Sequence, residues 1–361
     1  MSVPLEYLDP VRLGVPVLSA ARVKTFCEDF RVEERPTYQP SGEGEHLFLW
    51  VKKQDVSAAE LLRVISQQLK VNQRDIGVAG QKDRRAVTLQ YVSVPASCEP
   101  KIADFHDERI QILRAKRHAN KLRTGHVLGN RFLVVLRPTE EQFTATTCTA
   151  VERRLMEIAE SGFPNYYGTQ RFGTNSASVD LGVQLLNLSA KKRKANRASR
   201  FEKRMSISAV QSAVFNLVTS GRVANGSVNQ PIDGDVVCRR GGIRPFLYSN
   251  RNADETAQLI PMGPMPGPKM VAAEGEVLIQ QQNALQRLGL LDDHFSNSKT
   301  TPGARRPMLA WPTNCTCDLN DEGCLRLSFD LTAGSYATVL LREILQDTCE
   351  AEAVNIINNE T

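Results

Sequence analysis

A charged segment at residues 80–90 lies between a helix and a strand that the sequence pattern predicts. Ser57 and Glu60 have the spacing of a capping box, and apolar residues then recur at helical spacing up to residue 70. Residues 87–94 are rich in branched side chains and are typical of a strand. Similar patterns predict helices at 146–162, 206–221 and 277–290, a strand at 131–137, a hairpin at 315–331 and a last helix capped by Ser335.

The middle of the chain has a different character. Strand signals become sparse up to about residue 305, and the sequence GPMPGP at 263–268 predicts irregular structure. With 361 residues, of which 41% are hydrophobic, the chain is long enough for one large domain or two ordinary ones. The pattern therefore predicts α+β structure at both ends and a more helical segment between them.

Asp83 lies in the sequence GQKDRRAVTLQ, where three of its four nearest neighbours are cationic. Opposite charges within about 4–6 Å favour an ionised carboxylate. Such a carboxylate can act as a nucleophile or stabilise a developing positive charge. A solvated loop with local ion pairs is the alternative, because charge runs usually face water.

Positive charge is concentrated in two further segments. Residues 191–204 contain eight cations and one acid, and residues 114–123 contain five cations and no acid, while the formal net charge is only +5. This sorting indicates a polyanionic partner, with two solvated helices as the alternative. No hydrophobic run approaches about 18 residues, so we expect no membrane span. Eight scattered cysteines indicate free thiols and a cytoplasmic setting.

Two polar segments carry aromatic side chains. Residues 129–132 (GNRF) enter a predicted strand, and residues 165–173 (NYYGTQRFG) are aromatic, basic and bounded by glycine. Aromatic rings stack on bases while arginines hold phosphates, which favours RNA binding. Packing in a core or anchoring of a loop would explain the same rings.

With these segments the chain resembles the TruD family of transfer-RNA pseudouridine synthases. The resemblance rests on VKTFCEDFRVEE at 23–34, on the segments at 80–90, 129–132 and 165–173, and on FDLTAGSYATVLLRE at 329–343. It implies an α+β pseudouridine synthase domain with a mixed, mostly antiparallel sheet. It also implies that this catalytic domain comprises residues 1–158 and 308–361, with a family-specific TRUD domain of α/β structure inserted at 159–307.

The resemblance further implies isomerisation of uridine to pseudouridine at position 13, in the D arm of tRNA, without cofactor or metal. Asp83 would be the nucleophile, through attack on C1′ or through a glycal route. Lys24 would pair with it, Phe132 would stack on the uracil, and Asn130 would hydrogen-bond near the nucleophile or the base.

Other residues complete the expected site. Phe30 would pack beside the flipped nucleotide, and we expect Lys82 and Arg84, on either side of Asp83, to contact the substrate. We expect Arg171 and the run Lys191, Lys192, Arg193 and Lys194 to contact tRNA phosphates. A cytoplasmic monomer is expected. The alternative is a non-catalytic RNA-binding or RNA-folding protein, although binding alone does not need an anion facing phosphates.

Overall fold

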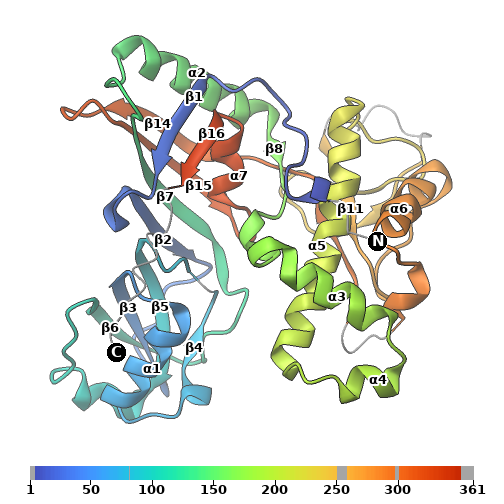
Figure 1. The fold of residues 1–361 in the computed structure, drawn as a ribbon. Helices are drawn as coiled ribbons and strands as arrows, with labels where there is room; N and C mark the ends of the chain where they lie inside the picture. The colour runs from blue at the N-terminus through green and yellow to red at the C-terminus, as the bar shows by residue number, and fades with distance from the viewer. Residues whose placement is uncertain (1–4, 81, 250–257, 297–300, 351–361) are drawn as a thin grey trace, which may run out of the picture. The chain divides into compact units, whose positions relative to one another are not determined.

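The computed structural model describes residues 5–80, 82–249, 258–296 and 301–350, which form two compact units (Figure 1). The sheet unit takes the described parts of residues 16–161, 311–334 and 344–361. The helical unit takes those of residues 1–15, 162–310 and 335–343. The limits 159–307 for an inserted domain stay a prediction.

A ten-stranded sheet is the centre of the sheet unit. Its strands are β1 (Leu18–Val23), β2 (Phe30–Pro36), β3 (His46–Gln54), β4 (Gly77–Val78), β5 (Val87–Pro95), β6 (Ile110–His118), β7 (Val127–Arg137), β14 (Thr313–Leu319), β15 (Leu325–Thr332) and β16 (Leu345–Glu350). The main order is β14-β15-β7-β2-β5-β3-β6, with β1 beside β7 and β16, and β4 beside β5. Among these pairings β1–β16 and β2–β5 are parallel and the others antiparallel. The predicted mixed, mostly antiparallel sheet and the hairpin at 315–331 are confirmed.

Helix α1 (Ala58–Gln68) covers part of this sheet, and helix α2 (Ala145–Ser161) packs on β14. Leu61, Val64 and Ile65 of α1 are buried in one cluster with apolar residues of β3 and β5. Ser57 accepts a hydrogen bond from the Glu60 amide, as the capping box predicts. The Glu60 carboxylate pairs with Arg109, and this hydrogen bond lowers the pKa of Glu60.

The helical unit is built around α5 (Arg200–Ala224), which begins at a capping box of Ser199 and Glu202. Helices α3 (Ala177–Asn187) and α6 (Gly275–Arg287) and strand β11 (Leu259–Met265) pack against α5. In the described part of this unit the other α-helices are α4 (Ala190–Ala195) and α7 (Ala337–Arg342), and the other strands are β8 (Phe163–Pro164), β9 (Val236–Arg239), β10 (Phe246–Leu247), β12 (Ala304–Pro307) and β13 (Leu309–Ala310).

Two sequence predictions in the helical unit are wrong. Gly263, Pro264 and Met265 belong to strand β11, in a sheet ordered β10-β9-β11-β12, and not to irregular structure. Proline fits because β11 pairs with β9 up to Pro261 and with β12 from Met262 onward, so Pro264 is paired on one edge only. Ser335 does not cap α7; its hydroxyl donates to Asn165 Oδ1, and Tyr336 is the residue before the helix.

Candidate active site

Asp83 lies in the loop between β4 and β5 of the sheet unit, beside a lysine with an unusual backbone. The Lys24 ammonium is 3.3 Å from Asp83 Oδ2, and the two side chains are 15% and 30% exposed. Lys24 has a φ of 58°, a left-handed conformation that costs free energy for a residue with a Cβ. The surrounding structure thus holds this lysine where it meets the carboxylate, as the predicted pairing requires.

A second lysine, which the sequence patterns did not single out, holds the same loop. Lys53 is fully buried on β3 and donates to the backbone oxygens of Asp83 at 2.8 Å and Val56 at 2.7 Å. Burial lowers the pKa of Lys53 to about 8, although the nearby Asp83 opposes this shift. Lys53 lies two residues after Val51 and therefore on the same buried face of β3. Because a buried cation needs partners, a lysine at such a position was the signal available in the sequence.

The cations flanking Asp83 have different environments. Lys82 is 6% exposed and pairs at 3.0 Å with Glu34, a fully buried carboxylate on β2. Arg84 is 70% exposed, with Asp55 at 3.5 Å. Arg85 donates to the Thr25 backbone oxygen at 3.1 Å. Lys82 is therefore part of the buried framework of the loop, whereas Arg84 is open to solvent.

Next to Lys24, three phenylalanine rings form a row of contacts that continues into the sheet. The Lys24 ammonium lies 4.1 Å from the centre of the Phe30 ring, a cation–π distance. Phe30 meets Phe132 edge to face with ring centres 5.9 Å apart, and Phe132 stacks on Phe329 at 5.5 Å. Phe132 is only 6% exposed. The structure thus brings Lys24, Phe30 and Phe132 together, with Phe132 largely enclosed by other rings.

Asn130 lies on the same face of the sheet as these groups. It is in register with Glu34 of β2 and Leu331 of β15. The residue before Asn130 is Gly129, and only glycine fits there because a Cβ would come within 2.0 Å of the Leu331 backbone oxygen. This sheet face, by register, also carries Lys53, Thr88 and Gln90.

Several oxygens of this face lack partners. Within the described part of the chain, Asn130 Oδ1, Thr88 Oγ1 and Gln90 Oε1 are buried and accept no hydrogen bond from protein. Buried polar atoms without partners are unfavourable and uncommon, and a catalytic role is one explanation for several of them on one face. We therefore regard this face, with the Asp83 loop at its edge, as the candidate active site.

The residues predicted to contact phosphates belong to the helical unit and lie far from Asp83 in the sequence. Arg171 donates to Ser208 and Ser212 of α5. Lys191 and Lys192 are exposed on α4, the helix that also contains Lys194. Arg193 donates to the carbonyl oxygens of residues 185, 186 and 188, the carboxyl end of α3.

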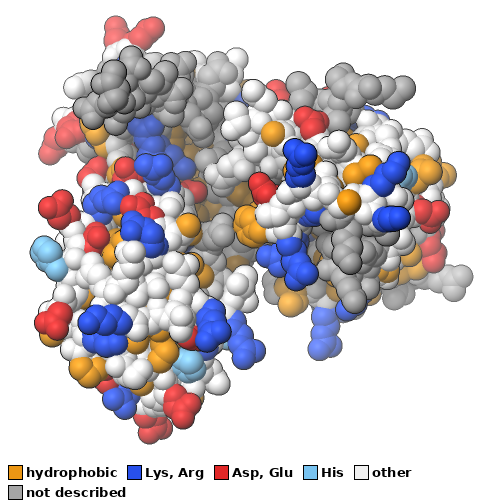
Figure 2. Space-filling model, turned by 60° about the horizontal axis from the view of Figure 1, so that its bottom comes forward, with side chains coloured by type: hydrophobic (Ala, Val, Ile, Leu, Met, Phe, Trp, Pro, Cys, Tyr) orange, Lys and Arg blue, Asp and Glu red, His pale blue; other side chains and the backbone are white. Residues whose placement is uncertain are grey.

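In the view of Figure 2, the lysine and arginine side chains of each unit are interspersed with acidic and hydrophobic ones. Within each unit, the cationic groups seen in this view are therefore mixed with other types. Among the described residues no three potential ligands cluster as a metal site would require, and no helix is long and apolar enough to cross a membrane.

Comparison with known proteins gives a consistent answer. The family model described as "tRNA pseudouridine synthase D (TruD)" matches residues 19–195 and 184–344. A tRNA pseudouridine synthase D of Anaeromyxobacter sp. (strain Fw109-5) is 38% identical over 92% of this chain and 94% of its own length. The enzyme of that name from Thermus thermophilus is 37% identical over 90% of each chain.

A solved structure supports the fold. The crystal structure of a putative tRNA pseudouridine synthase D from Methanosarcina mazei matches with a TM-score of 0.73 and 22% identity, over 96% of this chain and 99% of that one. The likeness of the fold therefore extends through both compact units. By its sequence and its fold, the chain belongs to the TruD family of pseudouridine synthases.

Proposed function

We propose that this protein isomerises uridine to pseudouridine in tRNA, at position 13 of the D arm, with Asp83 as the nucleophile. The relatives carry tRNA pseudouridine synthase in their names, which supports the substrate class. The position in the D arm rests on the family resemblance alone. Cytoplasmic location and action as a monomer remain predictions from the sequence.

The single observation that carries the proposal is the way Asp83 is held. Its carboxylate faces Lys24, and its backbone oxygen accepts a hydrogen bond from the buried Lys53. One lysine therefore orients the reacting group while the other fixes the loop. A carboxylate fixed in this way needs little reorganisation before it reacts.

The reaction exchanges one bond of the uracil for another. The bond from N1 to C1′ breaks, the base turns, and C5 bonds to C1′; the proton on C5 leaves and N1 gains one. Asp83 either attacks C1′ or assists a glycal route. The target nucleotide must first leave its stack, which costs a few kcal/mol. Phe132 and Asn130 would then hold the uracil by stacking and hydrogen bonding.

The test is Asp83→Asn, which preserves the side chain's size and the backbone contact with Lys53. We expect pseudouridine formation to fall by several orders of magnitude while tRNA binding persists, since a lost nucleophile costs far more than a lost contact. Single-turnover release of tritium from 5-tritiated uridine in tRNA measures the rate.

Asp55→Asn is the matched control, because Asp55 is a half-exposed aspartate close to the same loop, beside Arg84. It should retain nearly the parental rate. If Asp83→Asn stays within about tenfold of the parent, the aspartate is not the nucleophile. If the parent itself releases no tritium, the alternative of a non-catalytic RNA-binding protein is favoured.

A further inference from the structure

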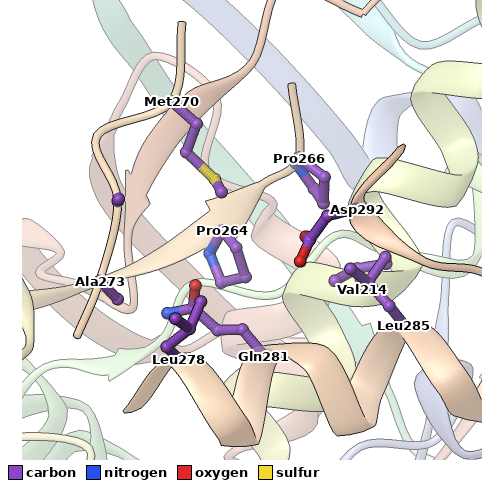
Figure 3. A pocket seen from close by; sticks show the side chains of 10 residues that line it. Val214, Pro264, Pro266, Met270, Ala273, Leu278, Gln281, Leu285 and Asp292 are labelled. Atoms are coloured by element: carbon purple, nitrogen blue, oxygen red, sulfur yellow. The ribbon is translucent and has the colours of Figure 1, made fainter. Parts of the chain in front are cut away.

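Enclosed space and buried charge lie in different units of the molecule. A cavity of about 200 Å³ lies in the helical unit, between β11 and α6 (Figure 3). Its lining is mostly apolar and includes Pro264, Met270 and Leu278. An apolar lining of this kind does not stabilise buried charge. The buried charges around Asp83 belong to the sheet unit, and among them is Glu34, whose side chain has no exposed surface.

Glu34 joins its own strand, β2, to the neighbouring strand β5. It lies in register with Asn130, on the sheet face of the candidate active site. The parallel pairing of β2 with β5 ends at Glu33 and Leu89. Beyond this point Glu34 Oε1 accepts a hydrogen bond from the Tyr91 backbone N–H at 3.3 Å. The carboxylate therefore continues the link between the two strands where their backbone pairing stops.

The other oxygen of Glu34 meets the loop that precedes β5. Glu34 Oε2 lies 3.0 Å from the Lys82 ammonium, and the Lys82 side chain is 6% exposed. Lys82 comes immediately before Asp83 in the sequence. A buried carboxylate and a buried ammonium are each unfavourable alone, so each needs the other as a partner. The pair thus ties the residue before Asp83 to the sheet.

Three lysine ammonium groups surround the loop, and each meets a different oxygen. Lys24 faces the Asp83 carboxylate at 3.3 Å, and Lys53 donates to the Asp83 backbone oxygen at 2.8 Å. Lys82 faces Glu34 instead. Opposite charges attract strongly where water is excluded. Without Glu34, the Lys82 ammonium would therefore compete with Lys24 for the carboxylate of the next residue.

We propose that Glu34 is a positioning residue for the nucleophile and acts on Asp83 through Lys82. It holds the loop to the sheet, and it keeps the Lys82 ammonium away from the reacting carboxylate. The proposal rests on the proposed function, in which Asp83 is the reacting group. Glu34 does not touch the substrate in this role, so its loss should slow the reaction without weakening tRNA binding.

Single-turnover rates at saturating tRNA, with affinities from filter binding, test this role. Glu34→Gln keeps the shape of the side chain but removes its charge, and Lys82→Met removes the ammonium at similar length. We expect each change to lower the rate about a hundredfold, the loss typical of a misplaced reacting group, with tRNA affinity within about twofold of the parent. Because both changes break one contact, the double variant should be no more than about threefold slower than either single variant.

Glu33→Gln is the matched control, because Glu33 is an exposed glutamate one position earlier on β2, and it should react like the parent. Independent action of Glu34 and Lys82 predicts that their losses multiply, to roughly ten-thousandfold in the double variant, and this result overturns the proposal. A Glu34→Gln variant that has a lower melting temperature but reacts at the parental rate overturns it as well.

A variant that does not fold leaves the test intact. If Glu34→Gln is unfolded, Lys82→Met is compared with the double variant, in which no buried charge of the pair remains. Equal rates of these two support the proposal. A double variant more than about tenfold slower than Lys82→Met contradicts it, since Glu34 would then act without Lys82.

Hydrogen exchange followed by mass spectrometry tests the same contact without catalysis. We expect the amides of residues 82–86 to exchange about tenfold faster in Glu34→Gln than in the parent, since a lost hydrogen bond to a charged group shifts local opening by at least this factor. Lys82→Met and the double variant should match Glu34→Gln, while the amides of α1 stay unchanged. Unchanged exchange in the loop overturns the anchoring role. A parent chain that forms no pseudouridine refutes the proposed function, and the exchange rates still decide whether Glu34 holds the loop through Lys82.

Discussion

The Asp83 loop and the basic segment at residues 191–204 hold cations in opposite ways. Around Asp83, Lys53 is fully buried and the side chains of Lys82 and Lys24 are 6% and 15% exposed, each with a fixed partner. In the basic segment, Lys191, Lys192, Arg197 and Arg200 are exposed. The same residue types therefore fix a loop in one region and face solvent in the other.

From this difference we expect the interactions of the two regions to depend on salt to different extents. Salt screens buried ion pairs only weakly. When exposed cations bind phosphates, counterions are released, so the binding affinity falls strongly as the ionic strength rises. The reaction step should thus be governed by the first region and docking by the second. The predictions below are ordered by their expected effect on the rate at saturating tRNA.

Changing Lys53 to methionine should have the largest effect of the three. The backbone oxygens of Asp83 and Val56 would lose their donor, and the loop would no longer be held in place. A shift of about 1 Å at a reacting group costs roughly a hundredfold in rate, and we expect a loss of this size in single-turnover assays. Lys52→Met, on the opposite face of the same strand, is the control and should react normally.

The pH dependence of stability provides a second measure of Lys53. Its pKa is about 8 in the fold against an ordinary value of 10.5, so between these values the unfolded chain binds more protons. Burial of the charge therefore destabilises the fold below pH 8, and this cost is relieved as the pH rises, by up to about 1.4 kcal/mol per unit. Denaturant titrations of Lys53→Met should lack this rise. Equal pH dependence in parent and variant would show that Lys53 is not a buried charged group.

Replacement of Phe132 should have an intermediate effect. Because this ring packs between Phe30 and Phe329, Phe132→Ala would cost about 3–5 kcal/mol of stability and confuse packing with chemistry. Phe132→Leu retains most of the volume at a cost of less than about 1.5 kcal/mol. If the ring stacks on uracil, the leucine variant should react about tenfold more slowly, since stacking contributes about 1–3 kcal/mol.

Phe132→Tyr is the matched variant, because it keeps the ring face, and it should retain most of the parental rate. Single-turnover rates and melting temperatures are measured together, with tRNA affinity from filter binding. A folded leucine variant that turns over like the parent would assign Phe132 to the core alone.

The sequence predicted those features that depend on local pattern. The helix after Ser57, the hairpin near the carboxyl end and the class of the sheet were confirmed, because periodicity and capping are properties of neighbouring residues. The start of α5 was predicted six residues late, although Ser199 and Glu202 have capping-box spacing, since the charged residues Arg200, Lys203 and Arg204 at the start of the helix conceal the apolar stripe.

The contacts within the candidate site were harder to predict from local sequence patterns. Lys24 and Asp83 are 59 residues apart, and their pairing was expected only from the family resemblance. The contact of Lys53 with the Asp83 backbone depends on the path of a loop 30 residues away, which no periodicity describes. The phosphate contact of Arg193 stays a prediction; in the structure this residue of α4 donates to carbonyl oxygens at the carboxyl end of α3, no more than eight residues away.

The basic segment should have the smallest effect on the rate and the largest on salt dependence. We predict that replacing Lys191, Lys192, Arg197 and Arg200 by serine, with Arg193 retained, weakens tRNA binding and changes the rate at saturation by less than about twofold. Each phosphate contact on a duplex contributes about 0.9 to the slope of log affinity against log salt. Four lost contacts should therefore reduce that slope by roughly three to four units in filter-binding titrations.

Arg193→Ser is the control: it should lower the melting temperature, because α3 loses its carbonyl contacts, while changing the slope by less than about one unit. An unchanged slope in the quadruple variant would mean that these cations face solvent and do not dock tRNA.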